Sequence, residues 1–148
     1  MEKWQSFGLW GLMGLSAFLF WRSIYECKER EGTFRETPYL NLLGIIVWAD
    51  GLIFAPFWFL VSGFCLWRGD FVLFLLITSV FWVVRSLGET IYWFNQQFST
   101  INRNDPKRLF GYSIVKNDAI WFLYQILWQC VSVISVVTTI YLSHLWLS

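Results

Sequence analysis

Four apolar stretches, each long enough to cross a lipid bilayer as a helix, constrain what this chain can fold into. Roughly 20 apolar residues in a helix span about 30 Å of hydrocarbon. The stretches cover approximately residues 4–25, 39–67, 71–94 and 118–146. They are too long for the strands of a membrane barrel, and they lack the strict alternation of such strands. The sequence therefore predicts an all-α fold, a bundle of four transmembrane helices that forms a single integral membrane domain over residues 1–148.

Composition points to the same environment. Hydrophobic residues make up 57% of the chain and charged residues only 14%, whereas soluble domains carry about 25% charged residues. Aromatic residues reach 22%, and 11 of them are tryptophans. Trp and Tyr concentrate where a bilayer meets water, because one part of each side chain is apolar and another is polar. We therefore expect a multi-pass, tryptophan-rich protein of the cell membrane.

Lysine and arginine gather on one side of the predicted membrane. The loops on that side hold eight of these residues: Arg22, Lys28, Arg30, Arg35, Arg103, Lys107, Arg108 and Lys116. The opposite side holds Lys3 and Arg68. Loops rich in Lys and Arg stay in the cytoplasm. The sequence therefore predicts both termini on the non-cytoplasmic side and both longer loops inside.

The loops differ in length and character. The second and third apolar stretches are joined by Arg68, Gly69 and Asp70, a spacing that predicts a tight turn and an antiparallel helical hairpin. The longest loop, residues 95–117, is polar at residues 102–106 and mixes apolar with basic residues on either side. This loop is either a plain connection or a segment that rests on the inner leaflet.

Three charged side chains fall within the apolar stretches: Asp50, Arg85 and Glu89. An unpaired charge at the bilayer centre costs about 2.5–3.5 kcal/mol on the insertion scale, so these residues should face protein or water. With a rise of about 1.5 Å per residue, Asp50 lies about 16 Å from the inner surface, Arg85 about 13 Å and Glu89 about 8 Å. Because Asp50 and Arg85 share a level, we predict that they pair. Arg85 also reaches Glu89, four residues further along the helix.

Helical periodicity gathers other polar residues onto two faces. The face on the third stretch comprises Thr78, Trp82, Arg85, Glu89, Tyr92 and Gln96. The face on the fourth comprises Asp118, Trp121, Gln125, Gln129, Ser132, Thr139 and Ser143. Turning both faces toward Asp50 predicts an intramembrane polar network of Asp50, Arg85, Glu89, Gln125 and Gln129. Arg22, Trp82, Tyr92 and Asp118 are its supporting residues, with Arg22 expected near Glu89.

The first stretch carries a different feature. Gly8 and Gly11 share a face with Leu15, which predicts a shallow groove. Small residues let membrane helices approach closely. The groove suits either packing inside the bundle or contact with a second copy of the chain.

Few residues suit metal, redox or nucleophilic chemistry. His144 is the only histidine, and Cys27, Cys65 and Cys130 form no CxxC pair. We therefore expect no metal site, no cofactor and no paired-cysteine oxidoreductase. The sequence contains no GxSxG motif and no phosphate-binding glycine loop, so no catalytic residue is predicted. A net charge of +1 argues against a nucleic-acid partner.

Two functions compete for the predicted network. If its groups fix the order of the helices, the protein is a non-enzymatic accessory or assembly module, whose partner is another membrane protein or a second copy. If the groups line a pathway, it is a small proton- or ion-coupled transporter. Asp50, Arg85 and Glu89 sum to −1 when ionised, an excess that Arg22, a proton or a bound cation would relieve. A lipid-modifying membrane enzyme is the third interpretation.

Overall fold

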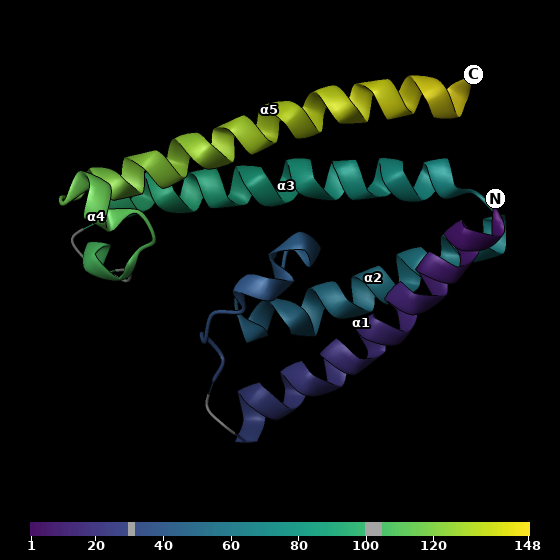
Figure 1. Cartoon of the computed structure of the whole chain (residues 1–148), viewed down its shortest axis with the longest axis horizontal. Helices are drawn as coiled ribbons and strands as arrows, with labels where there is room; N and C mark the ends of the chain where they lie inside the picture. Colours follow the sequence, from purple (N-terminus) through teal and green to yellow (C-terminus); the bar gives the residue numbers. More distant parts are fainter. Residues whose placement is uncertain (30–31, 100–104) are drawn as a thin grey trace. The chain divides into compact units, whose positions relative to one another are not determined.

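The computed structural model describes residues 1–29, 32–99 and 105–148, and it is all-helical, as predicted (Figure 1). The elements in chain order are α1 (Lys3–Glu29), η1 (Pro38–Leu43), α2 (Trp48–Arg68), α3 (Phe71–Phe98), η2 (Pro106–Arg108), α4 (Tyr112–Val115) and α5 (Ala119–Leu147). In these ranges, four helices are long and apolar enough to cross a membrane: α1, α2, α3 and α5. Arg30, Arg103 and most of the predicted polar turn at residues 102–106 lie outside the described residues.

The chain divides into two compact units, Met1–Ile77 and Thr78–Ser148. The division falls within α3, so that the first turns of this helix belong to the first unit and the remainder to the second. A single bundle of all four long helices stays a prediction.

In the first unit, α1 packs against α2 along a seam of small and apolar side chains (Figure 1). The buried residues recur at spacings of three, four and seven on both helices: Leu9, Ser16, Leu19, Ser23 and Glu26 on α1, and Trp48, Gly51, Ala55, Trp58, Ser62 and Cys65 on α2. Such spacing is typical of helices that pack side by side as in a coiled coil. The approach is closest at Gly51, where an added β-carbon would collide with the Ser23 hydroxyl.

The predicted glycine groove does not form this seam. Gly8 and Gly11 are exposed, and nothing lies within 4 Å of a β-carbon built at either position. The face that α1 turns toward α2 therefore carries serines and leucines in place of these glycines.

The second apolar stretch is not one continuous helix, and the predicted start near Tyr39 is wrong. Residues 38–43 form the short helix η1, which ends at Gly44 in the left-handed conformation (φ 73°), and α2 begins only at Trp48. Trp58 lies ten residues after the first residue of α2. Its indole N–H donates a 2.8 Å hydrogen bond back to the Leu43 carbonyl, at the end of η1. Part of this segment thus packs in the core beside α2, where Leu40 and Ile45 are buried.

The backbone of this folded-back segment is bonded within the unit. The Thr37 hydroxyl donates a 2.9 Å hydrogen bond to the Ile45 carbonyl, and the Thr37 amide donates a 2.7 Å hydrogen bond to the Ile46 carbonyl. Non-helical backbone is tolerated at membrane depth only where protein or water satisfies it. These bonds satisfy part of the backbone of the segment.

A tight turn joins α2 to α3, as predicted. Gly69 adopts the left-handed conformation (φ 67°) that ends α2, and the Asp70 carboxylate accepts a 2.9 Å hydrogen bond from the Leu73 amide at the start of α3. The first turns of α3 then pack on the first unit, where Phe71 contacts the Trp4 ring and Phe74 contacts the Trp58 ring.

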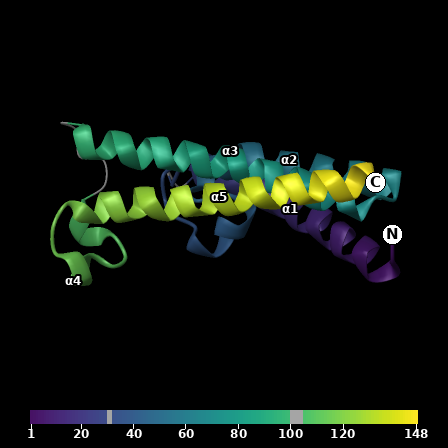
Figure 2. The ribbon, with the colours of Figure 1, turned by 90° about the horizontal axis from the view of Figure 1, so that it is seen from above.

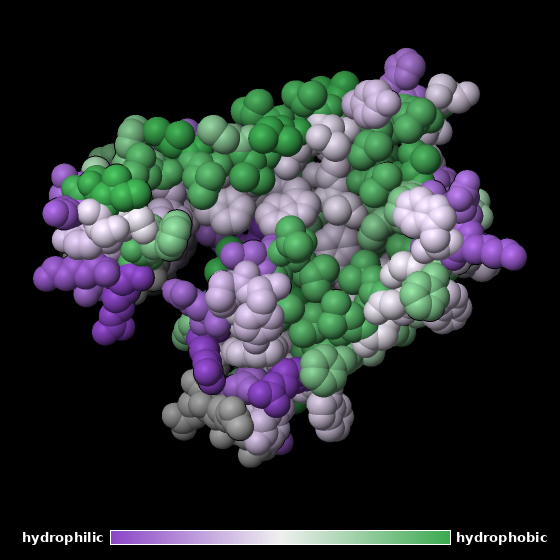
Figure 3. All heavy atoms as spheres, viewed as in Figure 1, coloured by the Kyte–Doolittle hydropathy of each residue, from purple (hydrophilic) through white to green (hydrophobic). Residues whose placement is uncertain are grey.

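In the second unit, the rest of α3 runs antiparallel to α5, and the two helices lie side by side in both views (Figures 1 and 2). A buried hydrophobic cluster of Trp93, Ile120 and Trp121 holds the last turns of α3 against the start of α5. Leu109 and Tyr112, from the connection between them, pack against this cluster. On the face shown in Figure 3, hydrophobic side chains cover much of α5, and hydrophilic ones gather around α4.

Candidate functional site

The seam between α3 and α5 is a series of hydrogen bonds between side chains of the two helices. The Thr139 hydroxyl donates to the Ser79 hydroxyl at 3.0 Å, and the Ser132 hydroxyl donates to the Ser86 hydroxyl at 2.8 Å. Near the end of α3 and the start of α5, the Gln97 amide donates to the Gln125 carbonyl oxygen at 2.6 Å. Inside a membrane, such bonds bind helices because lipid offers polar groups no alternative partner.

Aromatic rings fill the seam between these bonds. The Trp82 and Trp128 rings stack at 6.4 Å with an interplanar angle of 15°, and the Trp93 and Tyr124 rings lie 4.7 Å apart. The predicted supporting residue Trp82 therefore contacts α5. Its partner Trp128 was not predicted, and neither were Ser79, Ser86 and Gln97. The spacing of seven between Ser79, Ser86 and Trp93 was the sequence signal that could have identified this face.

Arg85 and Glu89 do form the predicted contact within α3, but on another face. The Arg85 guanidinium lies 2.9 Å from the Glu89 carboxylate, and the two side chains are only 16% and 13% exposed. At 100° per residue, their arc lies about 80° around α3 from the Ser79–Ser86 line. Trp82, a member of the predicted polar face, stacks on Trp128 of α5, and the expectation that the polar stripe of α5 also faces Arg85 and Glu89 stays a prediction. Tyr92, on the same arc, is 37% exposed and packs edge-to-face on Trp93.

The predicted stripe on α5 is only partly turned into the seam. Three of its residues form hydrogen bonds to α3: Gln125, Ser132 and Thr139. Trp121 is buried in the hydrophobic cluster with Trp93 and Ile120. Gln129 and Asp118 are exposed. At 100° per residue, Gln129 lies about 80–90° around the helix from the centre of the seam, and about 15 Å from the start of α5 at Ala119. The structure thus leaves an amide on the outer surface of a membrane-length helix.

Asp50 has a local role that the sequence interpretation did not anticipate. Its carboxylate accepts hydrogen bonds from the Ile46 amide at 2.9 Å and the Val47 amide at 3.2 Å, in a capping arrangement at the start of α2. Free amides at a helix start need such acceptors, and an acid there also suits the helix dipole. This is a common structural role for an aspartate.

The depth estimate that paired Asp50 with Arg85 does not hold. Because α2 begins at Trp48 and α3 continues to Phe98, Asp50 lies about 3 Å from its helix start and Arg85 about 20 Å from its helix end. The shared level was the reason for expecting the pair. Asp50 and Arg85 belong to different units, so an Asp50–Arg85 pair stays a prediction.

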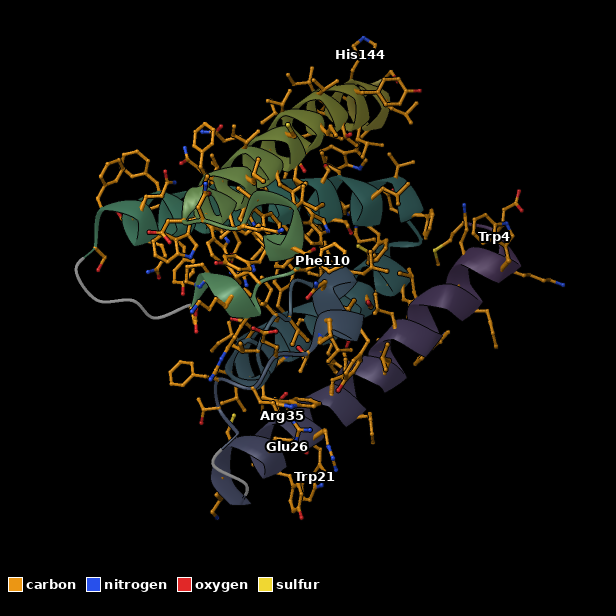
Figure 4. The ribbon with its side chains drawn as sticks, turned by 60° about the vertical axis from the view of Figure 1, so that its left-hand side comes forward. Trp4, Trp21, Glu26, Arg35, Phe110 and His144 are labelled. Carbon is orange, nitrogen blue, oxygen red and sulfur yellow. The ribbon has the colours of Figure 1, made fainter. Side chains whose placement is uncertain are left out.

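A second buried carboxylate, Glu26, was missed. Glu26 is 1% exposed and lies 2.6 Å from the Arg22 guanidinium, one turn earlier on α1. Figure 4 labels Glu26 near the end of α1. Arg22 was expected near Glu89, and a contact between Arg22 and Glu89, which belong to different units, also stays a prediction. The spacing of four between Arg22 and Glu26 was the signal available in the sequence.

The site offers charges and amides but little else. Within residues 1–29, 32–99 and 105–148, no three His, Cys, Asp or Glu side chains come together as a metal site requires. His144 is exposed in the last turn of α5, and Cys27, Cys65 and Cys130 are free thiols on separate helical positions. The chemistry that this arrangement supports is hydrogen bonding between helices, ion pairing and proton exchange at the carboxylates.

Comparison with protein-family models, with curated proteins and with solved structures returned no match for this chain. The function is therefore argued from the geometry above.

Proposed function

We propose that this protein is a four-span accessory or assembly subunit of the cell membrane, with both termini on the non-cytoplasmic side, and that α5 binds another membrane chain. The hydrogen bonds along the α3–α5 seam support a structural role for the polar residues of the seam, Gln125 of the predicted network among them. Ser79, Ser86, Gln97 and their partners bond to one another across the helices. These residues hold a scaffold together, and contacts with other chains fall to the outer surfaces of the helices.

The exposed amide of Gln129 carries the proposal. It lies about 15 Å into a helix that is long enough to span a bilayer. A primary amide that faces hydrocarbon loses its hydrogen bonds to water, and this loss is unfavourable unless another helix offers polar groups. A neighbouring chain that hydrogen-bonds Gln129 would remove the penalty. The open face of Gly8 and Gly11 on α1 is a second surface that would admit a close helix contact.

Site-specific photo-crosslinking tests the proposal. A photoreactive amino acid replaces Gln129 in the full chain, expressed in membranes, and mass spectrometry identifies what it captures. Leu127 is the matched control, because it is 56% exposed and lies roughly 160° around α5 from Gln129. We expect position 129 to capture another protein chain, or a second copy, and position 127 to capture lipid.

Two crosslinking results would contradict the proposal. Capture of lipid alone at both positions, or of residues of the same chain alone at position 129, would show that α5 has no partner there. A pull-down in mild detergent gives an independent check. The partner should be recovered in a fixed ratio to the wild-type chain and lost with Gln129→Leu, which keeps an apolar side chain of similar size.

A proton- or ion-coupled carrier is the second candidate. Two ion pairs within membrane-length helices favour it: Arg22 with Glu26 and Arg85 with Glu89. Ionisable residues inside transmembrane segments mark ion pathways and proton relays. A carrier must support pH-driven flux in liposomes that contain only this protein, and Glu89→Gln or Glu26→Gln must abolish the flux. The exposed Asp118 provides the control Asp118→Asn, which should leave the flux unchanged.

A further inference from the structure

The connection from Asp105 to Asp118 is held firmly against the second unit. Leu109 and Tyr112 pack on the cluster around Trp93 and Ile120, and the Tyr124 hydroxyl donates a 3.2 Å hydrogen bond to the Phe110 carbonyl. The turn is completed by Gly111 in the left-handed conformation (φ 88°), where an added β-carbon would lie 3.6 Å from the Ile120 δ1 methyl group. This connection therefore has a defined outer surface.

That outer surface is apolar at its centre. Phe110 is 92% exposed and Ile114 is 85% exposed, although the same connection buries other apolar side chains. Phe110 lies on the turn that leads into α4 (Figure 4). Side chains held outward in this way favour contact with something other than water.

Basic residues flank Phe110 and Ile114 in the sequence. Lys107, Arg108 and Lys116 are all exposed. Two acids also belong to the segment, and one of them, Asp105, accepts a 3.0 Å hydrogen bond from the Lys107 amide as a cap of η2. Apolar side chains next to lysine and arginine are the composition that binds the headgroup region of an anionic leaflet.

The loop between α1 and α2 repeats this arrangement independently. Phe34, Tyr39 and Leu42 are 84%, 71% and 85% exposed, although Leu40 and Ile45 of the same segment are buried. Arg35 is exposed beside Phe34. The hydrogen bond from Trp58 to the Leu43 carbonyl fixes the segment, so its outward side chains are also positioned by the fold.

We propose that both loops bind the headgroup region of one leaflet, with their exposed apolar side chains inserted and their basic side chains on anionic lipid phosphates. If the four long helices each cross the bilayer, the α1–α2 and α3–α5 connections emerge on the same side. The inference needs only these crossings and does not depend on a partner for α5. The partner it names is a bilayer surface that contains anionic lipid.

Spin labels at single cysteines test the proposal in the full chain reconstituted into vesicles, with Cys27, Cys65 and Cys130 replaced. The test positions are Phe110, Ile114 and Leu42. The references are Asn117 and Glu36, which are exposed polar loop residues, and Val137, which is 61% exposed within α5. Collision with oxygen reports hydrocarbon, and collision with a water-soluble nickel chelate reports water.

We expect the three test positions to be accessible to oxygen and to collide with nickel less often than Asn117 or Glu36 does, though more often than Val137. Nickel collision equal to that at Asn117 would place these side chains in water and overturn the proposal. Shielding from both reagents would mean that protein covers the loops, and it would overturn the proposal as well. The measurement uses the isolated chain, so its failure is distinct from the absence of a captured chain at Gln129.

The lipid charge is tested with the same labels. Adding phosphatidylglycerol to phosphatidylcholine vesicles should shift the labels at Phe110 and Ile114 deeper, toward higher oxygen and lower nickel collision. The triple variant Lys107→Gln, Arg108→Gln, Lys116→Gln should lose this shift and keep the depth seen in phosphatidylcholine alone. No shift in the parent chain, or a shift that survives in the triple variant, would refute recognition of anionic lipid by these side chains.

Discussion

The Ser132 hydroxyl donates a 2.8 Å hydrogen bond to the Ser86 hydroxyl, and this bond joins α5 to α3 near the middle of both helices. Ser86 in turn donates to the Trp82 carbonyl one turn earlier at 2.6 Å. The Ser86 hydroxyl thus donates within α3 and accepts from α5. Removing this bond by mutation therefore measures how much it contributes to the unfolding free energy of the protein.

A double-mutant cycle should detect this bond. Ser86→Ala and Ser132→Ala each remove one partner, and we expect a coupling free energy of about 0.6 kcal/mol, as for other hydrogen bonds between membrane helices. The measurement is the unfolding free energy in detergent for both single variants and the double variant. The control pairs Ser86→Ala with Thr138→Ala, because Thr138 is exposed and bonds to the Ile134 carbonyl of its own helix. Additive losses in both cycles would show that the bond contributes nothing.

Gly51→Ala should destabilise the first unit by about 1–3 kcal/mol, because the new methyl group forces Ser23 and α1 away. Adding Ser23→Gly should restore most of the lost stability, since it removes the group that collides. Gly88→Ala on α3 is the matched control, with nothing within 4 Å of its β-carbon, and should be neutral or slightly stabilising. An unfolding free energy for Gly51→Ala equal to the wild-type value would rule out this close packing.

Asp50→Ala should cost about 1 kcal/mol of unfolding free energy, a typical value for the loss of an N-terminal cap. Asp50→Asn should cost less, because its amide oxygen still accepts from Ile46 or Val47. Asp118→Asn should have no effect, because the Asp118 side chain forms no cap hydrogen bond at the start of α5. If Asp50→Asn proved as damaging as Asp50→Ala, the charge rather than the cap would be the important property.

Glu89→Gln should lower the unfolding free energy by about 2–3 kcal/mol, since it leaves the Arg85 charge largely buried without its carboxylate partner. Replacing both residues, with Arg85→Leu and Glu89→Leu, should be less costly than Glu89→Gln alone. This order separates an ion pair from two independent charges. A double variant at least as unstable as the sum of the single variants would argue against the pair.

Orientation is checked by labelling in intact cells. Cysteines at Lys3 and Ser148 should react with a membrane-impermeant maleimide, whereas cysteines at Thr33 and Lys116 should react only after the membrane is opened. The reason is the excess of lysine and arginine in the α1–α2 and α3–α5 connections. The reverse pattern of reactivity would place the termini in the cytoplasm.

The four long helices could be predicted because apolar length is a strong signal, but the start of α2 could not. Tyr39, Leu40, Leu42 and Leu43 are as apolar as the helix that follows, so hydropathy alone extends the span through them. Pro38 at the start of η1 and Gly44 at its end were the local signals of a separate turn. A tertiary contact holds this segment against α2: the Trp58 indole donates a hydrogen bond to the Leu43 carbonyl. No pattern in the sequence predicts that contact.

The site was predicted in part for a related reason. Arg85 and Glu89 touch because they lie four apart on one helix, and periodicity reports such local contacts well. Periodicity also put Gln125 on a polar stripe of α5, and the structure shows that it bonds to Gln97 of α3, but periodicity could not say which residues of α3 would meet it. The more polar face was chosen, whereas the helices meet through small serines and flat aromatic rings. Charge marks where burial is costly, while shape decides which faces pack.

The close approach at Gly51 has a consequence for how the first helix stays in the bilayer. Glu26 lies on the same stripe of α1 as Ser23, and its side chain is shielded there. An acid in that position is kept away from acyl chains only while the neighbouring helix stays near. A side chain as small as hydrogen at position 51 thus helps to keep a carboxylate out of contact with lipid, and wedging the pair apart would weaken the insertion of α1 itself.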